Sequence, residues 1–178
     1  MVSREVVMTF GIEFKNHLKA LAFLLITTIL ILAGGIYFKL NSEAILFGFV
    51  FYSIFFLPSL YLHIEYYLKN RGQRLEVLEN EIILHDRNGQ VRRYANQDLQ
   101  KIVLYKSASL DQGGIPLTPI ESYHYARIIP KQGEEIILTC LMAPNVEEAI
   151  KQIKWVSYER KKRLFASLNF SLRLMPDK

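Results

Sequence analysis

The side chains with the greatest capacity for chemistry are four histidines and one cysteine. The cysteine, Cys140, lies in the run Leu138-Thr139-Cys140-Leu141, where we expect a small buried residue rather than a nucleophile. The histidines are scattered along the chain and lack the close spacing of a metal-binding motif, so we interpret them as solvated or hydrogen-bonded side chains and predict no metal site. They are His17, His63, His85 and His124.

Two further motifs resemble sites only superficially. Gly113-Gly114 has neither the preceding pattern of a phosphate-binding loop nor its closing Lys-Ser or Lys-Thr, so we interpret it as a loop. Glu81 and Asp86 flank predicted turns and need no acid–base role. The sequence therefore predicts no catalytic residue and no cofactor, and an enzyme of unknown class ranks third among the functions considered.

A run of cations is a stronger candidate for binding. It consists of Arg160, Lys161, Lys162 and Arg163. Such a run can contact anionic lipid headgroups, at roughly 1 kcal/mol for each cation near the surface. Alternatively, it is a solvated helix end, where cations favour the helix dipole. Nucleic acid is not predicted as a partner, because no reader motif or interleaved aromatic residue accompanies the charge.

The elements that position these residues are organised around two apolar segments, 20–38 and 44–62. Neither contains a charged residue, and each is close to the roughly 20 residues that cross a ~30 Å hydrocarbon core. A chain of 178 residues is too short to bury two such helices inside a soluble domain. We therefore predict a transmembrane hairpin over residues 18–68.

Charge placement predicts how this hairpin lies in the membrane. Its connecting turn, 39–43, carries one cation and one anion, whereas cations flank the hairpin on both outer sides. By the positive-inside rule both termini are cytoplasmic, which describes a multi-pass protein of the cytoplasmic (inner) membrane. The outer cations are Arg4, Lys15, Lys19, Lys69, Arg71 and Arg74.

Small residues lie at similar depth on the two predicted spans. Gly34 and Gly35 precede the turn, and Ala44 and Gly48 follow it. Because small side chains let helix backbones approach closely, we expect these four positions to form the helix–helix contact.

The segment before the hairpin alternates apolar and other residues from Val6 to Phe14. Period two favours a half-buried strand over the alternative of an interfacial helix. A lone amphipathic strand needs a partner, so we expect residues 1–17 to contribute a strand to the cytoplasmic sheet.

Residues 73–178 form the predicted cytoplasmic domain. A helix is expected over about 145–163, with Asn145 as its N-cap and an apolar stripe on one face. In the C-terminal extension, 167–175, the pattern fits either a strand or a helical face. Six short strands precede the helix, at 74–79, 81–86, 90–95, 99–106, 123–130 and 134–142.

This order resembles that of YcxB-like and related bacterial membrane proteins with a pleckstrin-homology (PH)-like domain. The resemblance is carried by the early strand, the hairpin, the run from Arg74 through Leu84, and the capped helix from Asn145. It implies an α+β membrane protein with a two-helix transmembrane hairpin. Its soluble part would be an antiparallel PH-like sheet closed by a C-terminal amphipathic helix. It supplies no catalytic residue.

The function expected from these features is that of a membrane-anchored interaction or regulatory module without catalysis. Its expected partners are membrane lipids and a protein. The alternative is a sensor of anionic lipid headgroups at the inner leaflet.

Overall fold

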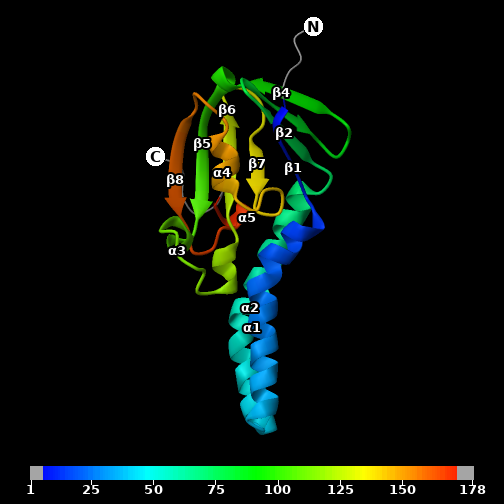
Figure 1. Ribbon diagram of the computed structural model, residues 1–178, viewed down its shortest axis with the longest axis vertical. Coiled ribbons are helices and arrows are strands. Elements are labelled where there is room, and N and C mark those ends of the chain that lie inside the picture. The colour runs from blue at the N-terminus through cyan, green and yellow to red at the C-terminus, as the bar shows by residue number, and fades with distance from the viewer. Residues whose placement is uncertain (1–5, 172–178) are drawn as a thin grey trace.

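Two long helices project from one end of a β-sheet domain in the computed structural model, which describes residues 6–171 (Figure 1). They are α1, Phe14–Tyr37, and α2, Ser42–Asn70. Only 11% of the most apolar window of each helix is buried, so neither is the core helix of a soluble domain. By length and composition both are able to cross a membrane.

The first sheet joins the segment before the helices to the segment after them. It contains β1 (Val6–Gly11), β2 (Arg74–Leu78), β3 (Glu81–His85) and β4 (Val91–Ala95), antiparallel and in that spatial order. In β1, Phe10 lies opposite Leu75 and Gly11 opposite Arg74. The alternating N-terminal segment is therefore a strand of the sheet, and the helical hairpin connects two neighbouring strands.

The second sheet has the order β7-β6-β5-β8. Its strands are β5 (Leu99–Lys106), β6 (Tyr125–Pro130), β7 (Ile136–Thr139) and β8 (Ser157–Lys162). All six strands predicted between the hairpin and the amphipathic helix are present. The short helices are η1 (Asn96–Asp98), α3 (Ala108–Asp111), η2 (Pro119–Ser122), α4 (Val146–Lys151) and α5 (Leu168–Ser171).

The prediction of one helix over 145–163 is wrong beyond its first turns. Asn145 does cap α4 by accepting a hydrogen bond from the Glu148 backbone N–H, and the apolar stripe is buried. The helix ends at Lys151, and the chain reverses through Trp155, whose φ is 67°. Residues 157–162 then pair in parallel with β5, which gives the backbone groups along that edge of β5 their partners. The basic run accordingly lies on and just after an edge strand, not at a helix end.

The C-terminal extension begins as the short helix α5, so the helical alternative holds for Leu168–Ser171. The rest of the predicted extension lies outside the described residues.

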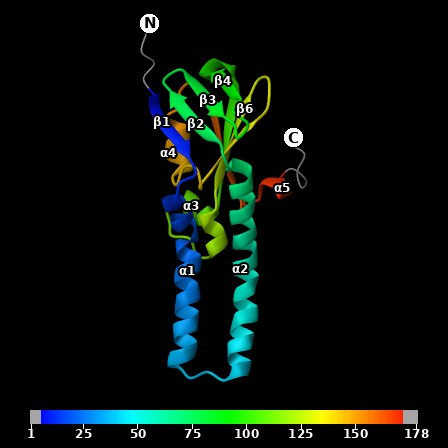
Figure 2. The same ribbon diagram turned by 90° about the vertical axis from the view of Figure 1, so that its right-hand side faces the viewer.

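The hydrophobic core includes the domain ends of both long helices. Leu62 and Tyr66 of α2 and Ala20 of α1 pack with buried residues of both sheets, such as Leu75 and Tyr125. The η2 segment contacts both helices. The base of the hairpin is therefore part of the domain, while its distal part projects away from it (Figure 2).

The close helix contact expected at the small residues is not seen. A methyl group built on Gly34, Gly35 or Gly48 would meet no atom within 4 Å. A cleft of about 570 Å³ separates the helices there, with Gly35, Ala44 and Gly48 among its lining residues.

Tyr52 bridges the helices nearer the domain. Its hydroxyl lies 2.7 Å from the Thr28 hydroxyl and donates to the Leu24 carbonyl at 3.0 Å. These contacts connect the two helices at one end of the cleft, of which Tyr52 is also a lining residue.

The register of β1 predicts which of its side chains stabilises the domain. Phe10 is half-buried against the core, whereas Thr9 is exposed opposite Glu76. Phe10→Ala should lower the free energy of unfolding by about 1–3 kcal/mol, because it removes apolar contact at a partly buried site. Thr9→Ala should change it by less than about 0.5 kcal/mol. Denaturant unfolding of the detergent-solubilised chain measures both, and equal losses would contradict the register.

Candidate functional site

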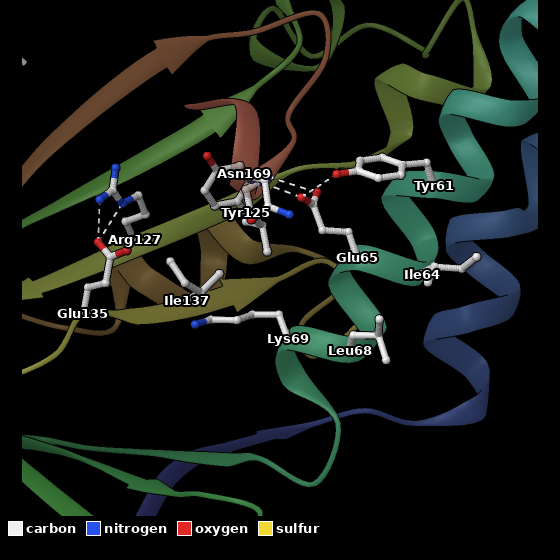
Figure 3. Close-up of a pocket in the computed structure, with 11 residues that line it drawn as sticks. Tyr61, Ile64, Glu65, Leu68, Lys69, Tyr125, Arg127, Glu135, Ile137 and Asn169 are labelled. Carbon is white, nitrogen blue, oxygen red and sulfur yellow. Dashed lines mark hydrogen bonds and ion pairs between the residues drawn. The ribbon is translucent and has the colours of Figure 1, made fainter. Parts of the chain in front are cut away.

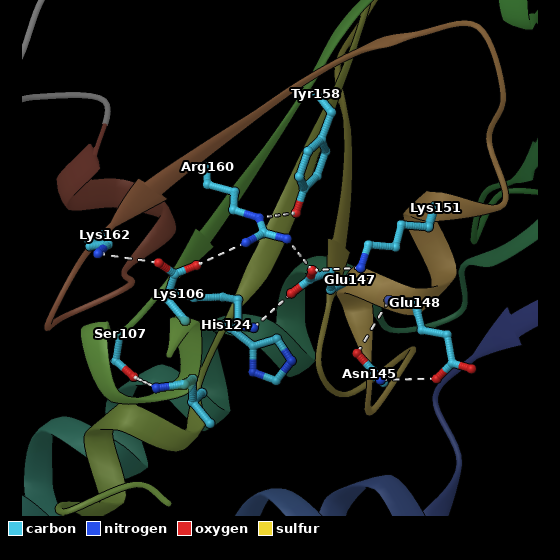
Figure 4. A network of polar contacts seen from close by, with 12 residues as sticks. Lys106, Ser107, His124, Asn145, Glu147, Glu148, Lys151, Tyr158, Arg160 and Lys162 are labelled. Atoms are coloured by element: carbon cyan, nitrogen blue, oxygen red, sulfur yellow. Dashed lines mark hydrogen bonds and ion pairs between the residues drawn. The ribbon is translucent and has the colours of Figure 1, made fainter. Parts of the chain in front are cut away.

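The basic run is engaged by carboxylates of the domain itself (Figure 4). Arg160 makes ion pairs with Glu147 and with Asp111, and Lys162 pairs with Asp111 at 3.4 Å. Lys161 lies 3.8 Å from Glu159, and the Arg163 guanidinium sits 5.8 Å from the centre of the Tyr105 ring. These contacts account for the four cations without a lipid.

Glu147 is the centre of this network. Its carboxylate accepts from Lys106 at 2.9 Å and pairs with Lys151 at 2.9 Å in addition to Arg160. Hydrogen bonds from Lys106 and Lys151 lower the pKa of Glu147 from 4.5 to about 2. The network ties α4 to β5 and β8. Sequence reasoning missed it, because its members are distant in the chain and become neighbours only through the parallel β5–β8 pairing.

A second candidate site is a pocket of about 440 Å³ between the domain end of α2, the β6–β7 edge and α5 (Figure 3). Nothing in the sequence pattern predicted it. It is lined by Tyr61, Ile64, Glu65, Leu68, Lys69, Tyr125, Arg127, Glu135, Ile137, Leu168 and Asn169.

Glu65 holds the C-terminal wall of this pocket in place. Its carboxylate accepts hydrogen bonds from the Ser167 hydroxyl and from the backbone N–H groups of Leu168 and Asn169, each at 3.0 Å. The Tyr61 hydroxyl donates to it at 3.3 Å. One side chain of α2 thereby fixes a segment about 100 residues later in the chain.

The remaining walls combine apolar surface with charge. Ile64 and Leu68 present a row along α2 and are 49% and 61% exposed. Arg127 and Glu135 neutralise each other through two hydrogen bonds of 2.8 and 2.6 Å. Lys69 is exposed at the rim, and within residues 6–171 no ion pair to it is seen. An amphipathic ligand with an apolar part and an anionic group fits this combination.

Two of the scattered histidines meet where the hairpin joins the domain. His17 Nδ1 lies 2.9 Å from His63 Nε2, and His63 Nδ1 lies 3.1 Å from the Tyr123 hydroxyl. No group of three or more histidine, cysteine or acidic side chains suited to a metal occurs among the described residues. The contact links α1 and α2 to the residue after η2.

The other candidate nucleophile, Cys140, is buried, and the other candidate base, His124, is half-buried. The Cys140 side chain is buried, which confirms the sequence interpretation of a small buried residue, and this burial raises the pKa of its thiol to about 12. Burial lowers the pKa of His124 to about 4, so its imidazole is neutral at physiological pH.

Comparison with known families agrees with this architecture. A family model described as "PH domain" matches residues 3–151, which is most of the chain. The chain therefore belongs to this PH-domain family. In this member two long helices lie inside the matched region, between its first and second strands, and the match ends with α4. No curated protein matches the chain.

The depressed pKa of Glu147 predicts an acid-sensitive contribution to stability. A carboxylate with a pKa near 2 in the folded chain and 4.5 otherwise stabilises the fold above about pH 4.5, and this contribution is lost as the pH falls toward 2. Glu147→Gln should therefore melt below the native chain at neutral pH, and the difference should shrink through that window.

Thermal unfolding followed by circular dichroism measures the effect. Glu148→Gln, at the exposed neighbouring position, is the control and should show a smaller difference at neutral pH. A difference for Glu147→Gln that stays constant from neutral pH to pH 2 would contradict the role of the network.

Proposed function

We propose that this protein is a membrane-anchored PH-like module that faces the cytoplasm and binds or regulates a protein partner without catalysing a reaction. The observation that carries the proposal is the insertion of the apolar hairpin between the paired strands β1 and β2. An anchor joined to the domain at two points fixes the orientation of the domain, which suits a module that presents one surface to a partner. PH domains are typically non-catalytic, and the family suggests an interaction or regulatory role.

The pocket beside α2 is the surface that we assign to the partner. Its exposed row of Ile64 and Leu68 fits an apolar helix or strand, and the Lys69 ammonium fits an acidic side chain next to it. Because the pocket abuts the hairpin, a partner that is itself a membrane protein can reach it without leaving the bilayer surface.

The finer assignment is to the YcxB-like proteins of the bacterial inner membrane. It is supported by the same order of strand, hairpin, sheet and capped helix. The charge-neutral turn and the flanking cations support a hairpin with both termini in the cytoplasm.

This topology predicts which positions are accessible from outside the cell. Single cysteines are placed at Asn41, in the turn, and at Trp155, which is 88% exposed on the domain, in a Cys140→Ala background. An impermeant maleimide should label the Asn41→Cys chain on intact cells, and the Trp155→Cys chain only after lysis. The reverse pattern would refute the proposed orientation.

The alternative function is a sensor of anionic lipid headgroups at the inner leaflet. Lys69 favours it, because this exposed cation lies on the rim of a pocket adjoining the hairpin. In contrast, Arg160, Lys161, Lys162 and Arg163 must exchange internal contacts for lipid contacts before they serve this role. No observation favours an enzyme.

One crosslinking experiment separates the two functions. A benzophenone amino acid replaces Leu68 in the pocket or, as control, Val91, which is 49% exposed on β4. Irradiation of membranes should give a protein adduct of defined mass from position 68 and not from position 91. A lipid adduct alone at position 68 would favour the headgroup sensor, and equal adducts from both positions would contradict a role for the pocket.

A further inference from the structure

The hairpin is proposed to cross the membrane, and its length limits the distance between the domain and the bilayer surface. About 20 helical residues cross a ~30 Å hydrocarbon core when the helix is upright. Counted back from the turn, this length ends near Leu18 on α1 and near Tyr61 on α2. A tilted helix needs more residues, which draws the domain still closer to the bilayer.

Parts of the domain lie at the same height along the hairpin as Leu18 and Tyr61, where the membrane-crossing length ends. Ala20 of α1 and Leu62 of α2 belong to the hydrophobic core of the domain and are 8% and 0% exposed. The η2 segment contacts both helices, and Ile120 packs against the same core. The hydrocarbon boundary therefore falls where η2 packs, and no spacer separates the domain from the bilayer.

The loop that leads into η2 carries large exposed apolar side chains. Ile115 and Leu117 are 80% and 79% exposed. In Figure 1 the segment between α3 and β6 is the part of the domain that extends furthest along the hairpin toward its tip. Two apolar side chains at such a position are costly in water and are stabilised by hydrocarbon.

A second segment reaches the same level from the other end of the chain. Leu164 is 68% exposed, and its neighbour Phe165 stacks on Tyr61 with ring centres 6.1 Å apart. Tyr61 marks the end of the membrane-crossing length on α2, so Phe165 lies at the membrane interface, where aromatic residues are favoured. The backbone N–H of Arg163 donates to the carbonyl of Lys106, which places this segment beside the end of β5 from which α3 follows.

We propose that the underside of the domain, formed by Ile115, Leu117 and Leu164, inserts into the cytoplasmic leaflet as a membrane contact separate from the hairpin. This inference rests on the proposed membrane anchoring. The partner is the acyl-chain region of the bilayer just below the headgroups. Insertion holds the sheets at a fixed height and angle, and it places the α2 pocket at headgroup level.

The only tryptophan of the chain, Trp155, supplies a built-in control for depth, since it is 88% exposed on the loop between α4 and β8. In a Trp155→Phe background, tryptophan is introduced singly as Ile115→Trp, Leu117→Trp or Phe47→Trp. Phe47 is 75% exposed near the turn end of the apolar part of α2 and reports on the hairpin alone. The full chains are reconstituted in phosphatidylcholine vesicles containing nitroxide-labelled lipids.

Tryptophan at positions 115 and 117 should emit at shorter wavelength than Trp155 of the native chain. A nitroxide near the lipid carbonyl should quench these two positions several-fold more strongly than it quenches Trp155. Quenching at position 47 with none at 115 and 117 would overturn the insertion and leave the anchor standing. Equal quenching of Trp155 and position 115 would also overturn it. Absence of quenching at position 47 would refute the membrane anchor and the insertion with it.

Discussion

The structure depends on a buried amide that joins the hairpin to the second sheet. Asn70, the last residue of α2, is fully buried. Its Nδ2 donates to the Ile137 carbonyl at 2.8 Å, and its Oδ1 accepts from the Thr139 hydroxyl at 2.6 Å. Asn16 makes the corresponding contact from α1, donating to the Leu141 carbonyl at 2.9 Å. A buried polar group that loses its hydrogen-bond partner costs free energy. Any other arrangement of the helices and the sheet would break these bonds, so they stabilise the observed one.

With its base fixed in this way, the hairpin is a structural part of the domain rather than an attached tether. Its two helices supply core side chains, and its ends continue directly into the paired strands β1 and β2. A change in helix tilt must therefore move the sheets. A ligand bound between α2 and the β6–β7 edge contacts the helix and the second sheet together and can change the angle between them. The pocket and the ion network lie on the second sheet, whereas the covalent connections to the hairpin lie on the first.

Local sequence signals predicted much of the fold. Apolar runs, period-two alternation and the Asn145 cap identified the helices, β1 and the six central strands, because each is set by neighbouring residues. The strand at 157–162 was not predicted, because this charged segment was assigned to a helix. It becomes a strand only because it pairs with the open edge of β5. The pocket and the Glu147 network were missed for the same reason: their residues meet through tertiary pairing. The close helix contact predicted at the small residues of the hairpin was wrong: a cleft lies there, and the hydrogen bonds between the helices come from Tyr52 instead.

The placement of the hairpin between β1 and β2 also orders the folding of the chain. β1 leaves the ribosome before its partner strand β2, and 62 residues, 12–73, which include both helices, separate the two strands. Closing so long a loop in a free chain carries a large entropic cost, whereas a formed hairpin brings Gly11 and Arg74 together. The sheet is therefore completed only once the helices stand side by side. Under the proposed membrane anchoring, entry into the bilayer is a step before domain folding, and a chain that fails to insert is left with an unpaired β2 edge and is prone to aggregation.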